Sequence, residues 1–509
     1  IAKNPNDAST HYLLGSLHES KKDYKAARDA YEGALRANPK MGPALNNLAS
    51  IYSEHVIDLE KALDAAQRAR EALPSQPEVA DTLGWIHFKR GQYAQALALL
   101  TESAERLPNH AEVRYHAGLA SYTSGLEADA RRHLEQALKL DPNLSAGADA
   151  RRCLDVLSSN ATGGAAARAV LEKALAARAD DPVAQLRLGA LHEHEGRPDA
   201  ALAAYTAALK TNSAFTPAIL GTVRVHARKD PAKALAFGRE ARKTLPAEPH
   251  LAAALGRISY QVGEFNAALG LLQEASRRLP DDGELFLDLA DAAYAMGAVP
   301  AAENALTDGL RAAPNSPRAP KARQFLELIQ LAQPGADTAV GAKTAAAALA
   351  SDPESVPALM LEAIALERGG DLKGALQSYD RILKRYPDFI PAKKRLAIVY
   401  AAQPEPPKTA AEVAAKAREA YPGDAEVARA FGLILFRQGN FQRASPLLQD
   451  AARTINDDAE LLYCLGRAQH ELKDTAAAKR SLERALEIGL KGDSAEQARR
   501  LLAAATEKK

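Results

Sequence analysis

The chain has 509 residues, of which 47% are hydrophobic, 25% are charged and only 5% are aromatic. This composition excludes wholesale disorder and a fibrous repeat. Its 65 basic and 64 acidic residues leave a formal charge of +1, which gives no electrostatic reason to expect nucleic acid as the main partner.

Alanine is abundant, as in residues 345–348 and 503–505, and the chain has a single tryptophan. Small residues in this quantity favour helices packed through alanine faces over sheets filled by β-branched and aromatic side chains. We therefore expect an all-α fold. No apolar run approaches the roughly eighteen residues needed to cross a bilayer, so we expect no transmembrane segment.

Prolines recur at a nearly constant spacing of 34 or 35 residues. The series comprises Pro5, Pro39, Pro74, Pro108 and Pro142, then Pro246, Pro280 and Pro314, and then Pro353, Pro387 and Pro422. In six of these periods, small residues lie twelve and five positions before the proline, as Ala27 and Ala34 do before Pro39. Residues seven apart share one face of a helix, where small side chains allow a neighbouring helix to come close. The proline follows the end of that helix, because it cannot continue the hydrogen-bond ladder.

A first helix precedes each alanine-faced helix. Its middle carries a Leu-Gly or Leu-Ala pair, at Leu14-Gly15, Leu48-Ala49, Leu83-Gly84, Leu188-Gly189, Leu255-Gly256, Leu289-Ala290, Leu396-Ala397 and Leu465-Gly466. Glycine inside a helix costs about 1 kcal/mol relative to alanine, so its recurrence implies a close helix crossing. A turn then divides each period into a helix pair. The turn glycines are Gly91, Gly125, Gly196, Gly263, Gly297, Gly370 and Gly439.

In chain order, the predicted helix pairs begin near residues 8, 42, 77, 111, 182, 215, 249, 283, 317, 356, 390, 425 and 459. Two segments depart from this register. Segment 143–181 has two helix-like stretches that flank a Ser/Asn/Gly-rich run at 158–164, which is the best candidate for a hinge or exposed loop. The alternative is a degenerate repeat with a loop insertion. Segment 317–355 has 39 residues and carries Gly341 where the first small alanine is expected.

With this period and these motifs, the chain resembles the tetratricopeptide repeat (TPR) family over nearly its whole length. The resemblance implies an α-solenoid, a right-handed superhelix of about thirteen helix-turn-helix units. Residues 1–7 read as the end of a preceding helix, so we expect further repeats upstream. The predicted organisation is an N-terminal array at 1–142, an irregular helical insert or hinge at 143–181, a second array at 182–492 with a degenerate unit at 317–355, and a capping helix at 493–509.

No sequence motif for catalysis or cofactor binding is present. The chain has no G-x-x-x-x-G-K-[ST] phosphate loop, no G-x-G-x-x-G after a strand and no G-x-S-x-G nucleophile motif. His192 and His194 are two residues apart, whereas a helical zinc site uses histidines four apart. Acidic pairs at 281–282 and 457–458 fall at turns, where we expect them to cap helices. The repeats leave no room for a separate catalytic domain, so we expect no enzyme, no cofactor and no metal site.

In the TPR family, the second, fifth, ninth, twelfth and thirteenth residues of each unit line the concave inner face. At these inner-face positions the chain has aromatic side chains and arginines, which are typical anchors for a bound peptide. The candidate partner-binding residues are Tyr12, Trp85, Phe88, Tyr115, Tyr122, Arg257, Tyr260, Tyr294, Arg429, Phe436, Tyr463, Arg467 and His470. The alternative is that the aromatic rings pack against the second helix of the next unit.

The stretches 43–49, 81–85 and 114–118 are similar to bacterial TPR proteins of envelope systems. The similarity is greatest to the lipoproteins that accompany PEP-CTERM sorting and exopolysaccharide export. It implies a location in the bacterial periplasm or at the envelope, with the cytoplasm as the alternative.

We therefore expect a non-catalytic scaffold or adaptor that binds a protein or peptide segment in its concave groove. Its setting would be a multi-protein complex for envelope assembly, secretion or exopolysaccharide export. One alternative is a carbohydrate-handling subunit, whose aromatic side chains stack on the sugar rings of a polysaccharide. Another is that the array is the regulatory arm of a larger enzyme with its catalytic domain upstream.

Overall fold

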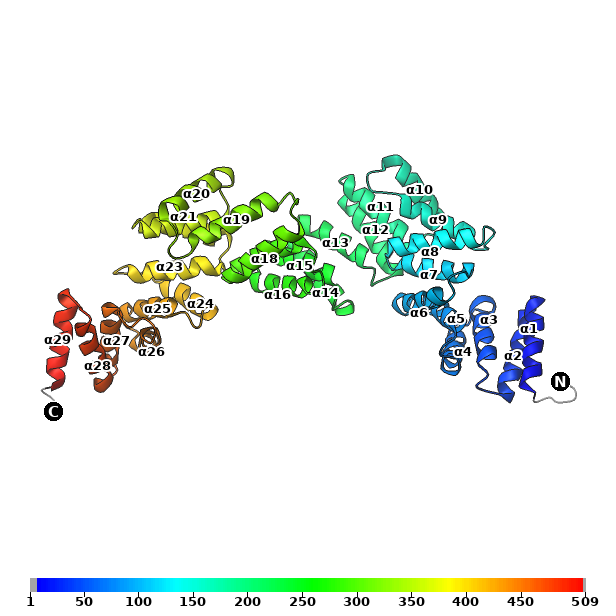
Figure 1. Cartoon of the computed structure of the whole chain (residues 1–509), viewed down its shortest axis with the longest axis horizontal. Coiled ribbons are helices and arrows are strands. Elements are labelled where there is room, and N and C mark those ends of the chain that lie inside the picture. Colours follow the sequence, from blue (N-terminus) through cyan, green and yellow to red (C-terminus); the bar gives the residue numbers. More distant parts are fainter. Residues whose placement is uncertain (1–6, 507–509) are drawn as a thin grey trace. The chain divides into compact units, whose positions relative to one another are not determined.

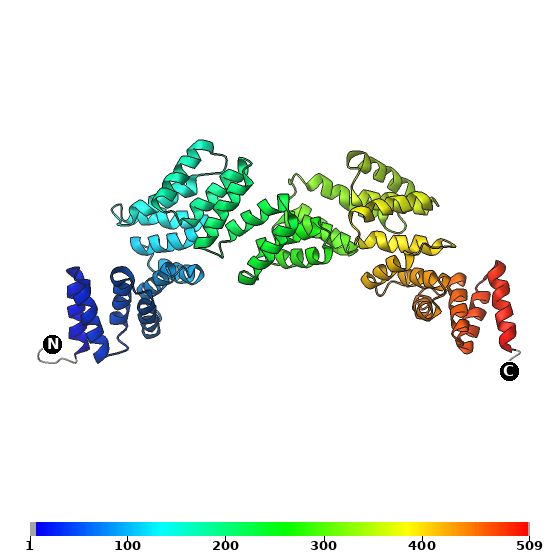
Figure 2. The ribbon, with the colours of Figure 1, turned by 180° about the vertical axis from the view of Figure 1, so that it is seen from behind.

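The computed structural model describes residues 7–506, and within that range every regular element is a helix, which confirms the all-α prediction. The chain divides into two compact units, Ile1–Pro246 and Ala247–Lys509. Within each unit the helices follow one another in space in the order of the sequence, as Figure 1 and Figure 2 show from opposite sides.

The first unit contains fourteen α-helices and one π-helical turn among its described residues. They are α1 (Ala8–Ser20), α2 (Tyr24–Ala37), α3 (Gly42–Ile51), η1 (Tyr52–Val56), α4 (Leu59–Ala72), α5 (Pro77–Lys89), α6 (Tyr93–Arg106), α7 (Ala111–Thr123), α8 (Glu127–Leu140), α9 (Gly147–Ser158), α10 (Gly164–Ala177), α11 (Pro182–His194), α12 (Pro198–Thr211), α13 (Thr216–Lys229) and α14 (Pro231–Thr244). The π-helical turn η1 lies in the period between Pro39 and Pro74, and it accommodates the thirty-fifth residue of that period.

The second unit contains fifteen α-helices in its described part. They are α15 (Pro249–Gln261), α16 (Phe265–Ser276), α17 (Gly283–Ala295), α18 (Val299–Ala312), α19 (Ala319–Ala332), α20 (Thr338–Ser351), α21 (Val356–Arg368), α22 (Leu372–Arg385), α23 (Ile390–Ala402), α24 (Ala410–Ala420), α25 (Ala425–Arg437), α26 (Phe441–Ala452), α27 (Ala459–Glu471), α28 (Thr475–Glu487) and α29 (Gly492–Thr506).

Consecutive helices pack as pairs in the predicted register. Each of the thirteen predicted units coincides with one pair, from α1 and α2 to α27 and α28, and segment 143–181 adds a further pair, α9 and α10. The last helix, α29, packs on α27 and α28, and its Ala498 is buried in the same hydrophobic cluster as Leu482.

In half of the pairs, the close crossing depends on a glycine in the middle of the first helix. A Cβ atom at Gly432 would lie 2.7 Å from Cδ2 of Leu448 and 3.2 Å from the backbone nitrogen of that leucine. At Gly189 the ring of Tyr205 fills the same notch. The second helix contributes the predicted small residues, which are fully buried at Ala27, Ala34, Ala62, Ala69, Ala130, Ala137, Ala268, Ala275, Ala410 and Ala417.

Turns and helix starts follow the predicted chemistry. All seven predicted turn glycines have φ between 71° and 84°. Asp282 and Asp458 cap α17 and α27, because their carboxylates accept hydrogen bonds from the backbone N–H groups of Leu285 and Leu461. These acidic residues therefore act as the predicted caps.

In the first unit, the repeats on either side of α9 and α10 contact each other directly. The Tyr122 hydroxyl on α7 donates to Asp181, the N-cap of α11, at 2.9 Å. The side-chain amide of Asn212, at the end of α12, donates to the carbonyl of Thr123 at 3.0 Å. The repeats before and after the irregular pair α9 and α10 therefore touch each other directly. We call such a direct contact across intervening helices a bypass.

A second bypass in the second unit brings α17 against α23, past the two intervening pairs α19/α20 and α21/α22. Tyr294 on α17 packs against Phe389, the N-cap of α23, with ring centroids 5.7 Å apart. Gly297, in the turn after α17, lies against Tyr421, and a Cβ atom there would overlap the tyrosine hydroxyl, so only glycine fits. Phe389 is 174 residues after Phe215, the N-cap of α13 and its counterpart in the first bypass.

The limit between the compact units does not coincide with a predicted boundary. The predicted insert 143–181 lies inside the first unit, where α9 ends at Ser158 and Ser159 in the following turn is buried. The limit at Pro246 has no sequence signal, because this proline continues the regular series. The predicted degenerate unit 317–355 contains the pair α19 and α20. Residues 1–6 of the predicted upstream helix and 507–509 of the predicted cap lie outside the described residues.

Replacing Gly432 by alanine is expected to destabilise the protein. Displacing Leu448 from the notch costs about 1 to 3 kcal/mol, which exceeds the roughly 1 kcal/mol that alanine gains as a helix former. A Cβ atom at Gly270 of α16 meets nothing within 4 Å, so Gly270→Ala is expected to stabilise. The two thermal unfolding midpoints should move in opposite directions, and shifts of the same sign would contradict the packing role of the notch.

Candidate functional site

Two of the predicted binding residues of the first unit, Phe88 and Tyr115, lie beside a third, Trp85 on α5. Its ring stacks on Phe88 and His116, with centroid distances of 5.0 Å and 4.0 Å. Its indole N–H donates to Glu54 at 2.9 Å, and the ring also approaches Tyr115. A sugar ring could stack only on a free indole face, and the Trp85 ring is already stacked on protein side chains.

Five of the predicted aromatic anchors are buried. They are Phe88, Tyr115, Tyr122, Tyr294 and Tyr463, whose residues are 2% to 8% exposed. These rings fill space between helices and do not stand open in a groove. Phe88 packs on Tyr93 in the second helix of its own unit, and Tyr294 packs on Phe325 in the first helix of the next unit. Tyr294 in addition lines the larger pocket described below.

The three predicted arginines are hydrogen-bonded to residues about thirty positions further along the chain. The acceptors are Asp288 for Arg257, Asp458 for Arg429 and Gln497 for Arg467. Arg467 also lies over the ring of Phe436 and bonds to Tyr463, which brings these three together. The remaining predicted residues are partly exposed; these are Tyr12, Tyr260 and His470.

A pocket of about 300 Å³ lies on inner-face positions of the second unit; we call it the inner pocket. The five units that begin at 283, 317, 356, 390 and 425 all contribute to it, because the bypass brings α17 against α23. Its lining includes Tyr294, Ile329, Gln333, Met360, Ile364, Arg368, Lys394, Tyr421 and Glu426.

The polar groups of the inner pocket differ in how far they are already engaged. Lys394 is paired with Asp424. Burial acts to raise the pKa of Asp424, but the hydrogen bond and charge of this lysine, together with hydrogen bonds from backbone N–H groups, outweigh burial and lower that pKa. Burial raises the pKa of Tyr421 to about 12, so its phenol stays neutral. Arg368 is exposed and donates to two backbone carbonyls, while the exposed carboxylate of Glu426 has no bonding partner among the described residues. Arg368 and Glu426 are thus the charges that the pocket presents to solvent.

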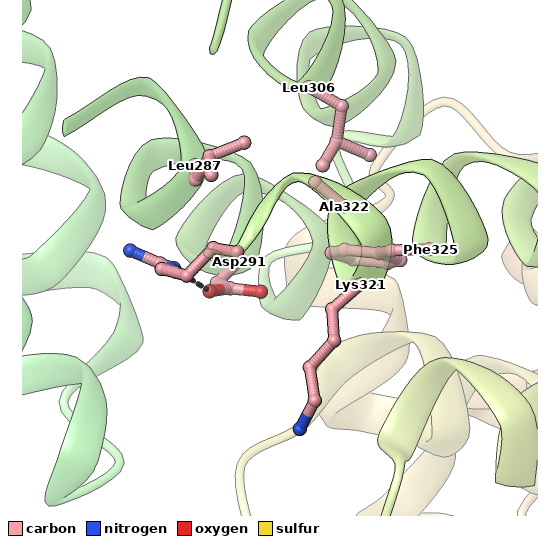
Figure 3. Close-up of a pocket in the computed structure, with 7 residues that line it drawn as sticks. Leu287, Asp291, Leu306, Lys321, Ala322 and Phe325 are labelled. Carbon is pink, nitrogen blue, oxygen red and sulfur yellow. Dashed lines mark hydrogen bonds and ion pairs between the residues drawn. The ribbon is translucent and has the colours of Figure 1, made fainter. Parts of the chain in front are cut away.

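Figure 3 shows a smaller pocket of about 160 Å³. It lies beside the inner pocket. Phe325, which lines the smaller pocket, packs edge to face on Tyr294, with ring centroids 5.1 Å apart. The smaller pocket is lined by Leu287, Asp291, Leu306, Arg318, Lys321, Ala322 and Phe325. The ring pair of Phe325 and Tyr294 therefore separates the two pockets, with Phe325 lining the smaller one and Tyr294 lining the inner pocket.

Most residues of the two pockets were not among the predicted binding residues, although many occupy inner-face positions. Asp291 is the ninth residue of the unit that begins at 283, and Met360, Ile364 and Arg368 are the fifth, ninth and thirteenth of the unit that begins at 356. The inner-face positions of the family include these residues. They were not predicted, because the prediction included only aromatic and arginine side chains at those positions. Tyr421 lies outside these positions, since it enters the pocket only through the bypass.

Tetratricopeptide repeat profiles match the chain at residues 8–41, 82–145, 161–217, 259–324, 326–388 and 429–493. Among curated relatives, a TPR repeat-containing protein of Pseudomonas aeruginosa is 26% identical over 114 residues, which are 22% of this chain and 19% of the relative. The photosystem I assembly protein Ycf3 of Prochlorococcus marinus is 34% identical over 116 residues, which are 22% of this chain and 66% of the relative. The chain thus spans about a fifth of the first relative and just under two thirds of the second.

Solved structures of low sequence identity also match. The Cut9-Hcn1 hetero-tetramer of the APC/C is 14% identical, with coverage of 98% of this chain and 96% of that chain and a TM-score of 0.32. The TPR domain of P58(IPK) is 16% identical, with coverage of 78% and 99% and a TM-score of 0.29. YrrB, described as a TPR protein with an unusual peptide-binding site, is 17% identical, with coverage of 43% and 93% and a TM-score of 0.26.

Within residues 7–506, no helix combines the length and apolarity needed to cross a membrane. The same residues contain no group of three or more His, Cys, Asp or Glu side chains placed to hold a metal ion.

Tyr122→Phe is expected to lower the free energy of unfolding by about 1 to 3 kcal/mol, because it removes a hydrogen bond to the buried carboxylate of Asp181. Tyr12→Phe is the matched control, since the Tyr12 hydroxyl has no bonding partner in the described part of the chain, and we expect a change within about 0.5 kcal/mol. Urea unfolding measures both values. Equal stabilities of the two variants would show that the Tyr122 bond does not hold the first bypass.

Proposed function

The chain belongs to the tetratricopeptide repeat family, and we propose that it is a non-catalytic scaffold that binds an extended segment of a partner protein. TPR arrays are scaffolds typical of protein–protein interaction. The observation that carries the proposal is the inner pocket, in which inner-face positions of five units converge.

The chemistry of the inner pocket suits a peptide. Met360 and Ile364 are buried and give the floor an apolar character, while Arg368 and Glu426 offer exposed charges of both signs at the rim. An apolar centre with a polar rim is the usual anatomy of a protein-binding surface. An apolar side chain of the partner would enter the floor, and polar groups of its backbone and flanking residues would meet the rim.

The pocket is also held in shape before any partner binds. The ring pair of Tyr294 and Phe389 and the close approach of Gly297 to Tyr421 fasten its two sides together. A rigid site loses less conformational entropy on binding than a mobile one. This rigidity favours recognition of a defined segment.

We further propose that the scaffold acts in a bacterial envelope complex for assembly, secretion or exopolysaccharide export, in the periplasm or at the envelope. The support is the resemblance of residues 43–49, 81–85 and 114–118 to TPR proteins of such systems. The relative named a photosystem I assembly protein gives separate support for an assembly role. Identification of proteins that co-purify with the chain from its native source tests the setting, and a set made up of cytoplasmic proteins would contradict it.

Charge reversal at the rim is expected to abolish partner capture. Arg368→Glu and Glu426→Lys change exposed side chains, so each should reduce recovery of the partner at least about tenfold, as the loss of a charged contact does. Glu426→Lys should do so without lowering the unfolding midpoint, whereas Arg368→Glu also removes the hydrogen bonds to two backbone carbonyls and should lower it slightly. Quantitative mass spectrometry of proteins captured by each variant measures the effect.

The matched control is Glu105→Lys, an exposed position on α6 in the first unit. This variant carries the same charge change as Glu426→Lys and should recover the partner as the unmodified chain does. If the unmodified chain and all three variants recovered the partner equally, the inner pocket would not be the binding site.

A further inference from the structure

The smaller pocket beside the inner pocket combines an apolar wall with one carboxylate. Leu287, Leu306 and Phe325 form the wall, and Figure 3 shows Asp291 at its edge. We propose that this pocket, the lysine pocket, receives a lysine side chain of the bound partner segment. The inference rests on the proposed function, because it assigns one residue of the segment that the scaffold would bind.

The carboxylate of Asp291 has one oxygen available to a ligand. Its Oδ2 accepts a hydrogen bond from Arg318 at 3.3 Å, whereas Oδ1 has no partner within the described residues. The side chain is 34% exposed, so a ligand can reach it. An ammonium group needs only one such oxygen, while a guanidinium binds best to two parallel oxygens. The geometry therefore favours lysine over arginine.

The charges around Asp291 leave one carboxylate in excess. Arg318 is 2.8 Å from Asp288 and 3.2 Å from Glu284, and Arg257 pairs with the same Asp288. Three carboxylates on α17 are thus matched by two guanidinium groups. A cationic ligand completes the balance, whereas an anionic one would increase the excess.

Lys321 does not supply the missing cation. Its side chain is 80% exposed, and its ammonium lies 3.6 Å from Asp352. Figure 3 shows its stem leading away from Asp291. The apolar wall therefore stays open to the methylene stem of a partner lysine, whose burial adds affinity.

The lysine pocket is placed to act together with the inner pocket. Phe325 and Tyr294 form the partition between them, with ring centroids 5.1 Å apart. A segment that crosses this partition would put a lysine in one pocket and a neighbouring side chain in the other.

The same surroundings make the site sensitive to pH. The pKa of Asp291 is raised to about 7, because burial and the neighbouring charge of Asp288 raise it more than the guanidinium of Arg318 lowers it. The other charged groups on the packed helices are Glu284 on α17, Arg257 on α15 and Lys321 on α19, while α18 contributes the apolar Leu306. The phenol of Tyr260 on α15 also interacts with Asp291; burial, followed by this carboxylate, raises the pKa of Tyr260, so the phenol stays neutral. Below pH 7 the carboxyl is mostly protonated and loses its attraction for a cation, so lysine binding strengthens as pH rises through 7.

The test uses the full chain with labelled leucine methyl groups and n-pentylamine as the probe, which reproduces a lysine stem and its ammonium. At pH 8, pentylamine should shift the methyl signals of Leu287 and Leu306 and bind at least tenfold more tightly than 1-pentanol or pentanoate. Between pH 8 and pH 6 its affinity should fall roughly tenfold, since the ionised fraction of a group with a pKa of about 7 falls about tenfold. Asp291→Asn should weaken binding at pH 8 about tenfold and remove the pH dependence. The control Lys373→Gln, at an exposed position on α22 outside both pockets, should change neither.

Equal binding of 1-pentanol or pentanoate would overturn the proposal, as would full binding by a folded Asp291→Asn variant. Tighter binding of n-pentylguanidine than of pentylamine would overturn the assignment to lysine. If Asp291→Asn does not give a folded methyl spectrum, the pH series on the unmodified chain decides. Glu426→Lys should bind pentylamine normally, so failure of the lysine pocket and failure of partner capture by the inner pocket are told apart.

Discussion

The array depends on one close contact, repeated in half of the helix pairs, between the backbone of the first helix and a large side chain of the second. At Gly15 the notch receives the ring of Tyr31, and at Gly256 it receives Leu272. This contact sets how closely and at what angle the two helices cross. Since most pairs then present the same surface to the next, the stack can continue with alanine contacts and few aromatic side chains.

The two bypasses show where the stack departs from this rule and what the departure creates. An irregular pair leaves the repeats on either side free to touch, and a phenylalanine at the start of a later helix fills the contact in both units, as Phe215 and Phe389. In the second unit this contact closes one side of the inner pocket. The surface best suited to a partner therefore arises from the least regular part of the array.

Features that depend on contacts within one period could be predicted from the sequence, because the period repeats them. The helix pairs, the turn glycines and the caps at Asp282 and Asp458 belong to this class. The contact of Tyr294 with Phe389 joins distant periods and leaves no periodic trace, so neither pocket could be located. The scarcity of aromatic residues does not indicate that those present are exposed binding residues. In an alanine-rich chain the few large rings, such as Tyr122, are needed to fill the space between helices and are therefore buried. The boundary between the two compact units at Pro246 could not be predicted, because the repeat register continues through it without a change in sequence pattern.

The bypass also changes how the chain can come apart. In an array whose units touch only their neighbours, melting can begin at an end and spread one unit at a time. The ties of Tyr294 to Phe389 and of Gly297 to Tyr421 join helices that two other pairs separate. Contacts between distant segments are slow to form, because a long loop must close first. Once formed, they oblige the stretch from α17 to α24 to melt as one cooperative block, so the geometry that hollows the groove also sets the size of the smallest piece that unfolds.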